Sequence, residues 1–74
     1  MDIEAMKRFP IEDFLARLGH HPVQRRANAV WYRSPYREEH TPSFKVNPEK
    51  NLWFDFGEGK GGNIFALAGE VIKT

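Results

Sequence analysis

Cysteine is absent from this chain of 74 residues. Without thiols the chain forms no disulfide framework and no thiolate metal site, which are common reinforcements of domains this small. No apolar run is long enough for a signal peptide or a membrane span, so we expect a cytoplasmic protein with no membrane partner. Apolar burial must then hold the fold, and six phenylalanines, two tryptophans and two tyrosines are present for it.

A strong charge of one sign is also lacking, because the formal net charge at pH 7 is +1. That value is too small to predict nucleic-acid binding by itself. The distribution says more: Arg25, Arg26 and Arg33 lie in a stretch with no acidic residue between Asp13 and Glu38. A local basic face on a nearly neutral domain can bind phosphates, although an ordinary solvated surface explains the same pattern equally well.

Three helices are predicted from apolar periodicity. Apolar residues recur at helical spacing over residues 3–9 and again over 11–18, where a proline opens the pattern and a glycine follows it. Asn63 can cap a last helix that carries an apolar stripe over residues 64–72. Because this helix shows no stop signal before Thr74, we expect the chain to be a fragment of a longer protein.

Three short strands are predicted between the helices. Residues 29–33, 43–47 and 52–56 are rich in β-branched and aromatic side chains, and residues 48–51 suit a hairpin connection. The expected architecture is an α+β fold in which N-terminal helices and a C-terminal helix flank a three-stranded antiparallel sheet. Residues 1–74 then form a single domain.

Four polar residues stand at the spacing of zinc-ribbon ligands: Ser34, Arg37, Asp55 and Glu58. None is a cysteine or histidine, whereas structural zinc sites are closed by thiolate and imidazole ligands. The guanidinium fork of arginine suits carboxylates. We therefore expect no metal, with Arg37 between Asp55 and Glu58 and with Ser34 completing the cluster. An alternative, His40 joining both carboxylates around a metal, makes a weak ligand set without a thiolate.

The run SPYREEHTPSFKVNPEKNLWFDFGEGKGGNIF resembles the N-terminal zinc-ribbon module of bacterial DNA primases. The family pattern is C-P-aromatic-H, T-P-S-F, a hairpin, then C-F-G-C-G-x-G-G and a helix. The matching positions are Pro35, Tyr36, Thr41, Pro42, Ser43, Phe44, Phe56, Gly57, Gly59, Gly61 and Gly62. Only the four ligand positions depart from the pattern. The resemblance implies a zinc-ribbon-like fold that has lost its zinc.

By this resemblance the chain is the template-recognition module of a DNA primase, of the kind carried by a mobile element. Primer synthesis would then take place in a catalytic domain downstream, and the domain itself would have no catalytic residues. The expected partner is a single-stranded DNA template in DNA replication, together with the catalytic domain or a helicase. No cofactor is expected.

The predicted sheet supplies candidate DNA-binding residues. On each of two strands, one aromatic of a neighbouring pair should face solvent, and outward aromatics beside basic residues bind single strands by stacking. The tryptophans can instead be core residues that compensate for the lost metal. The candidates are Arg25, Arg26, Trp31, Arg33, Lys45, Trp53 and Lys60.

Two other functions remain open. Gly57, Gly59 and Gly62 match a dinucleotide-binding motif, but too few residues follow for the rest of that unit. A simpler phosphate site with Lys60 beside the glycine loop is an alternative, as is a plain structural role in turning the chain. The domain can also be a protein-docking module, which exposed apolar surface on the last helix would favour.

Overall fold

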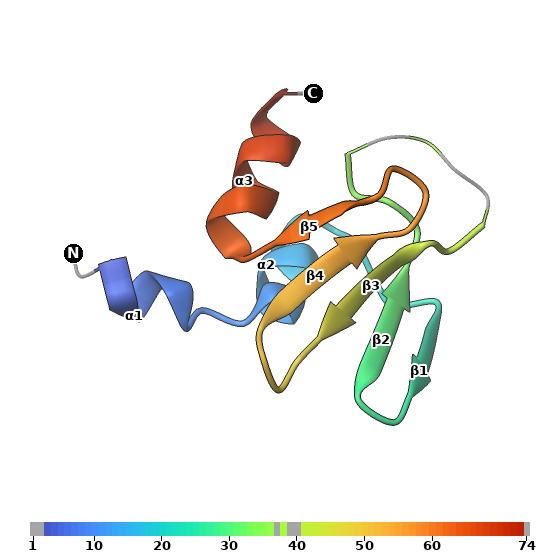
Figure 1. Cartoon of the computed structure of the whole chain (residues 1–74), viewed down its shortest axis with the longest axis horizontal. Helices are drawn as coiled ribbons and strands as arrows, with labels where there is room; N and C mark the ends of the chain where they lie inside the picture. Colours follow the sequence, from blue (N-terminus) through green and yellow to red (C-terminus); the bar gives the residue numbers. More distant parts are fainter. Residues whose placement is uncertain (1–2, 37, 39–40, 74) are drawn as a thin grey trace.

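The computed structural model describes residues 3–36, 38 and 41–73. Figure 1 shows one sheet with α2 behind it and α3 beside its β5 edge. The elements are α1 (Ile3–Lys7), α2 (Ile11–Arg17), β1 (Gln24–Arg26), β2 (Ala29–Tyr32), β3 (Phe44–Asn47), β4 (Leu52–Asp55), β5 (Lys60–Gly62) and α3 (Ile64–Lys73). The α+β class and all three predicted helices are confirmed.

The sheet is an antiparallel meander of five strands in the order β1-β2-β3-β4-β5. The three predicted strands form its centre, and two strands of three residues each extend it at both edges. These edge strands escaped prediction because QRR and KGG contain no apolar residue, so only backbone pairing forms them. Gly61 is required in β5, since a Cβ there would clash with the Trp53 carbonyl oxygen.

The pairing register separates the two faces of the sheet. Val30, Val46 and Trp53 stand in one cross-strand row, and helices α2 and α3 cover that inner face with Ile11, Leu15, Ile64 and Leu67. The neighbouring row of Trp31, Lys45 and Phe54 points to the outer face. Alternation of side chains along each strand produces this division.

The two longer helices are bounded by the residues that the sequence predicts. Pro10 stands before α2, and Gly19 follows it with a φ of 89°. Asn63 precedes α3, and its Oδ1 accepts a hydrogen bond of 3.1 Å from the Ala66 backbone amide. Such caps satisfy amides that have no partner within the helix.

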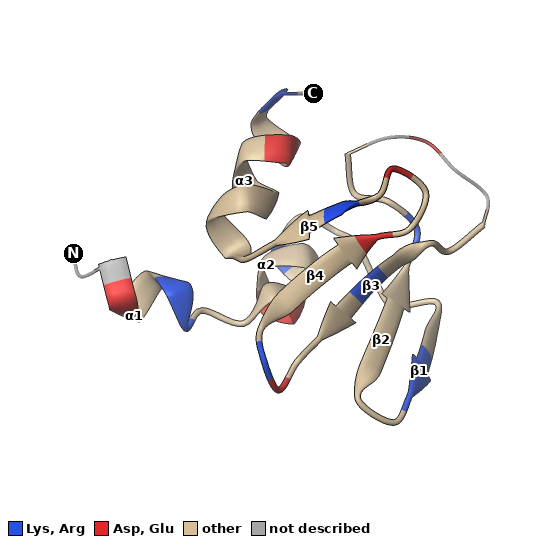
Figure 2. Ribbon diagram, in the orientation of Figure 1, with Lys and Arg blue, Asp and Glu red and all other residues tan. Residues whose placement is uncertain are grey.

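Acidic and basic residues are interspersed over the ribbon instead of forming one large basic face (Figure 2). No helix in residues 3–36, 38 and 41–73 has the length and apolar character needed to cross a membrane.

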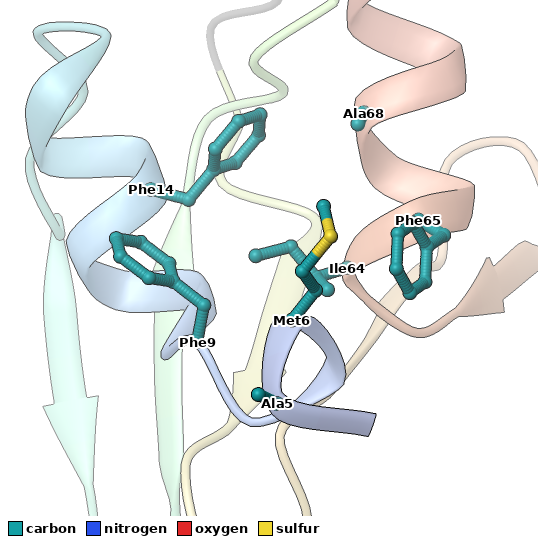
Figure 3. A pocket seen from close by; sticks show the side chains of 7 residues that line it. All are labelled: Ala5, Met6, Phe9, Phe14, Ile64, Phe65 and Ala68. Carbon is teal, nitrogen blue, oxygen red and sulfur yellow. The ribbon is translucent and has the colours of Figure 1, made fainter. Parts of the chain in front are cut away.

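The three helices also enclose an apolar hollow of about 420 Å³ (Figure 3). Phe9 and Phe14 line one side of it, and Ile64 and Phe65 line the side formed by α3. Met6 from α1 projects between them. The exposed fractions of Met6 and Phe65 are 38% and 37%, so the hollow opens to solvent.

Candidate functional site

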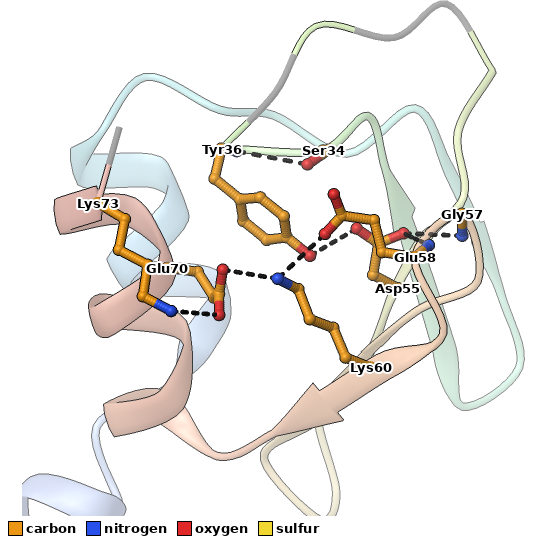
Figure 4. Close-up of polar contacts among 8 residues, drawn as sticks. All are labelled: Ser34, Tyr36, Asp55, Gly57, Glu58, Lys60, Glu70 and Lys73. Atoms are coloured by element: carbon orange, nitrogen blue, oxygen red, sulfur yellow. Dashed lines mark hydrogen bonds and ion pairs between the residues drawn. The ribbon is translucent and has the colours of Figure 1, made fainter.

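Asp55, one of the four residues at zinc-ligand spacing, organises the turn between β4 and β5. Its side chain is fully buried. One carboxylate oxygen accepts hydrogen bonds from the backbone amides of Gly57, at 2.8 Å, and Glu58, at 3.3 Å. The other oxygen accepts a hydrogen bond of 2.5 Å from the Tyr36 hydroxyl (Figure 4). A buried carboxylate thus holds the turn from β4 to β5 and joins it to the segment after β2 that contains Ser34 and Tyr36.

Tyr36 is the residue after β2 that binds Asp55. Its ring is buried and makes edge contacts with Phe44 and Trp53, with centroids 6.2 and 6.1 Å apart. Its backbone amide donates to the Ser34 hydroxyl at 3.4 Å. The tyrosine therefore belongs to the hydrophobic core and, through its hydroxyl, to the polar cluster.

Lys60 adds a positive charge to the cluster around Asp55. Its ammonium group lies 2.7 Å from the Glu70 carboxylate and 3.1 Å from that of Glu58, and 5.2 Å from the centroid of the Tyr36 ring. The hydrogen bond to Glu70, followed by that to Glu58, raises the pKa of Lys60, and the bond from Lys60 lowers the pKa of Glu70. This partly exposed network connects the β4–β5 turn to helix α3 (Figure 4).

The predicted placement of Arg37 between Asp55 and Glu58 concerns a residue outside those that the structure describes, as does the alternative with His40. It stays a prediction. What the structure adds is that Lys60, which the sequence predicts as a DNA-binding residue, pairs with two carboxylates. The partner on α3 is ten residues further along the chain, a separation that no local pattern revealed.

The residues at the ligand positions do not fit a zinc ion. The chain contains no cysteine, and nowhere in residues 3–36, 38 and 41–73 do three potential ligands gather around one point. Both Asp55 oxygens already accept hydrogen bonds, and the Lys60 ammonium lies beside Glu58. The ligand replacement expected from the sequence is thus accompanied by a hydrogen-bonded cluster in the same place.

The outer face of the sheet carries a cluster of three aromatic side chains, Trp31, Phe54 and Phe56. The Phe56 ring stacks on Trp31 with centroids 5.7 Å apart, and the edge contact with Phe54 has centroids 4.8 Å apart. Phe54 and Phe56 are 40% and 58% exposed. Lys45 stands between Trp31 and Phe54 in the strand register. Phe56 was noticed only as a family match, although its continuation of the β4 alternation marks it as outward.

Trp53 is not part of this cluster, which corrects its assignment to the DNA-binding set. Its side chain is 4% exposed and stacks on Phe44 with centroids 5.2 Å apart. The indole nitrogen donates a hydrogen bond of 2.9 Å to the Asn63 carbonyl. Because Trp53 pairs with Val46 in the inner row, the outward aromatic of β4 is Phe54.

The three candidate arginines lie in different surroundings. Arg25 pairs with Glu12 of α2 at 2.6 Å, so its guanidinium is held on the inner side of the sheet. Arg26 is exposed, and its guanidinium lies against the Gln24 side chain on the outer face. Arg33 is exposed directly after β2. Arg26 and Arg33 are therefore better placed than Arg25 to contact a ligand on the outer face.

This antiparallel sheet with its two opposed turns defines a zinc-ribbon-like domain. A sequence model of the CHC2 zinc finger, the zinc ribbon of DnaG, matches residues 4–74. The chain belongs to this family, the zinc-ribbon domains of DnaG-type DNA primases, and the resemblance found in the sequence is confirmed. It departs from the family at the ligand positions.

Individual relatives of this chain are named DNA primase. The DNA primase of Treponema pallidum is 36% identical over 62 residues, which cover 82% of this chain and 10% of the relative. That of Listeria monocytogenes is 54% identical over 33 residues, or 45% of this chain and 5% of the relative. For Geobacillus stearothermophilus the DNA primase is 46% identical over 37 residues, 50% and 6% respectively. The chain thus spans a tenth or less of these relatives.

Proposed function

We propose that this domain binds single-stranded template DNA for a DNA primase in replication, using the outer face of its sheet. The observation that carries the proposal is the exposed cluster of Trp31, Phe54 and Phe56 with Lys45 beside it. Aromatic rings stack on bases of any sequence, and neighbouring cations attract the phosphates. In this proposal residues 1–74 are one module of a longer cytoplasmic primase of a mobile element, and primer synthesis takes place in another domain.

The structure limits how many phosphates this face can neutralise. Arg26, Arg33 and Lys45 are its candidate cations by position, because Arg25 is held by Glu12 on the inner side of the sheet and Lys60 lies between Glu58 and Glu70. Affinity should therefore be weak and should fall with salt along a shallow slope, about −0.7 per phosphate contacted on a single strand. Stacking adds roughly 1–3 kcal/mol per base engaged.

The test is to titrate an oligothymidylate into wild type, Trp31→Ala and Phe54→Ala and to measure the chemical-shift changes of the protein. Each variant should lose about 1–3 kcal/mol of binding free energy while circular dichroism shows the fold intact. Leu18→Ala is the matched control, because Leu18 is an apolar side chain of similar exposure, 45%, at the end of α2. Unchanged affinity in both aromatic variants would contradict the proposal.

A second candidate function, docking onto another part of the primase, is favoured by the apolar hollow between the three helices. Phe65 lines it, and Ile72 on the same helix is 82% exposed. If the hollow holds the catalytic domain, Phe65→Ser should weaken that association and leave oligonucleotide affinity unchanged. Loss of oligonucleotide affinity in Phe65→Ser would instead place the DNA near α3.

A further inference from the structure

A basic hollow of about 330 Å³ lies where the β3–β4 turn meets the end of α1. Its charged lining consists of Lys7, Arg8 and Lys50 against the single carboxylate of Glu49. Blue segments at the end of α1 and on the β3–β4 turn mark these cations in Figure 2. No local pattern indicates that these residues share one hollow, because Lys50 lies far from Lys7 and Arg8 along the chain.

The side chain of Asn51 fixes the two walls of this hollow to each other. Its oxygen accepts a hydrogen bond of 2.8 Å from the Ile11 amide, and its nitrogen donates to the carbonyls of Lys7 and Phe9 at 3.0 and 2.8 Å. The backbone of Asn51 has a φ of 54°, which asparagine tolerates better than most residues. The backbone segments that carry Lys7, Arg8 and Lys50 are therefore held beside each other before any ligand arrives.

The basic hollow adjoins the outer face of the sheet through a shared lining residue. A second hollow of about 250 Å³ is lined by Lys45, Phe54 and Phe56, among others. Lys50 lines both hollows. A path therefore leads from the aromatic cluster along the β3–β4 hairpin to the end of α1.

We propose that the basic hollow binds backbone phosphates of the same single strand whose bases stack on the outer face. This inference rests on the proposed function and extends its site to residues that no sequence pattern marks. Three cations against one carboxylate complement a polyanion, and the guanidinium of Arg8 can bind a phosphate through two parallel hydrogen bonds. Lys7 is 3.5 Å from Glu4, but the two side chains are 44% and 69% exposed, so solvent weakens this competing pair.

The inference makes the effect of cation removal depend on oligonucleotide length. Single-strand modules bind from about 4 to about 16 nucleotides, so about 4 should occupy the aromatic cluster and about 12 should also reach the hollow. The variant Lys7→Gln/Arg8→Gln, whose two cations line only the basic hollow, should bind the long oligothymidylate on the order of tenfold more weakly at 0.15 M salt, with a salt slope shallower by about 1.4. Its affinity for the short one should stay within about twofold, as expected for charges outside the contact region.

The control variant Arg17→Gln/Lys73→Gln removes the same charge from α2 and α3, away from the path. Melting temperatures of both variants should be measured first, to check that each variant is folded. If the two variants lose equal affinity for the long oligothymidylate while Phe54→Ala loses more, the hollow does not bind DNA and the outer-face proposal survives. If wild type binds neither length, both proposals are wrong.

Discussion

Strand β4 places Asp55 in the buried turn cluster and Phe54 on the outer face, one residue apart. In the turn cluster, the acceptor oxygens of Asp55 and the cation of Lys60 find partners within the protein. On the outer face, apolar rings remain partly exposed and contact one another. A replaced ligand position thus makes its contacts within the protein, whereas the rings on the face proposed for DNA leave apolar surface exposed to solvent.

The two regions should respond oppositely to mutation, because one contributes to folding and the other to binding. Surface ion pairs contribute little to stability, so the Lys60 network cannot replace a metal ion by itself. The packed aromatic core around Phe44, Tyr36 and Trp53 must supply most of the stabilisation.

The largest effect is expected from restoring the metal site with Ser34→Cys, Arg37→His, Asp55→Cys and Glu58→Cys together. Structural zinc contributes about 10–16 kcal/mol in zinc-finger peptides, so zinc should raise the melting temperature strongly and a chelator should reverse this. Elemental analysis should find stoichiometric zinc in the variant and none in wild type. Failure of the folded variant to bind zinc would show that the turns no longer have ribbon geometry.

A large effect of opposite sign is expected from Trp53→Ala, which should lower the free energy of unfolding by about 3–5 kcal/mol. Phe54→Ala, the adjacent residue on the outer face, should change it by about 1 kcal/mol or less. Urea denaturation monitored by circular dichroism measures both. Equal losses would mean that the outer aromatic cluster is a second core, and the contrast between the two regions would disappear.

The smallest effect is expected from Lys60→Met, and it should depend on pH. Because folding lowers the pKa of Glu70, this part of the stability is present above its unfolded pKa, about 4.3, and is lost as the pH falls through the folded value. Because folding raises the pKa of Lys60, its part is present below about 10.4 and is lost as the pH rises through the folded value.

Melting temperatures of wild type and Lys60→Met should therefore differ most between about pH 5 and pH 10, and the difference should shrink outside that range. Lys45→Met is the control, since Lys45 lies on the outer face away from these carboxylates. A difference that does not change with pH would mean that Lys60 acts through packing of its aliphatic stem.

The fold class, the three helices, the three central strands and the family can all be predicted from the sequence. These follow from local signals: apolar periodicity, caps, turn residues and a pattern of short motifs. The sequence also located the replaced ligand positions, because their spacing is fixed along the chain. The choice between neighbouring aromatics was left open by the sequence, since alternation alone does not say which of Trp53 and Phe54 faces inward.

The other features could not be predicted in this way, because each depends on contacts between residues that are distant in the sequence. The register of β3 against β4 put Trp53 in the core, and packing of α3 brought Glu70 to Lys60. The edge strands exist through backbone pairing, for which polar and glycine residues give no signal. The hydrogen bonds of Asn51 join segments about 40 residues apart and bring Arg8 to Lys50, a proximity that no local pattern encodes.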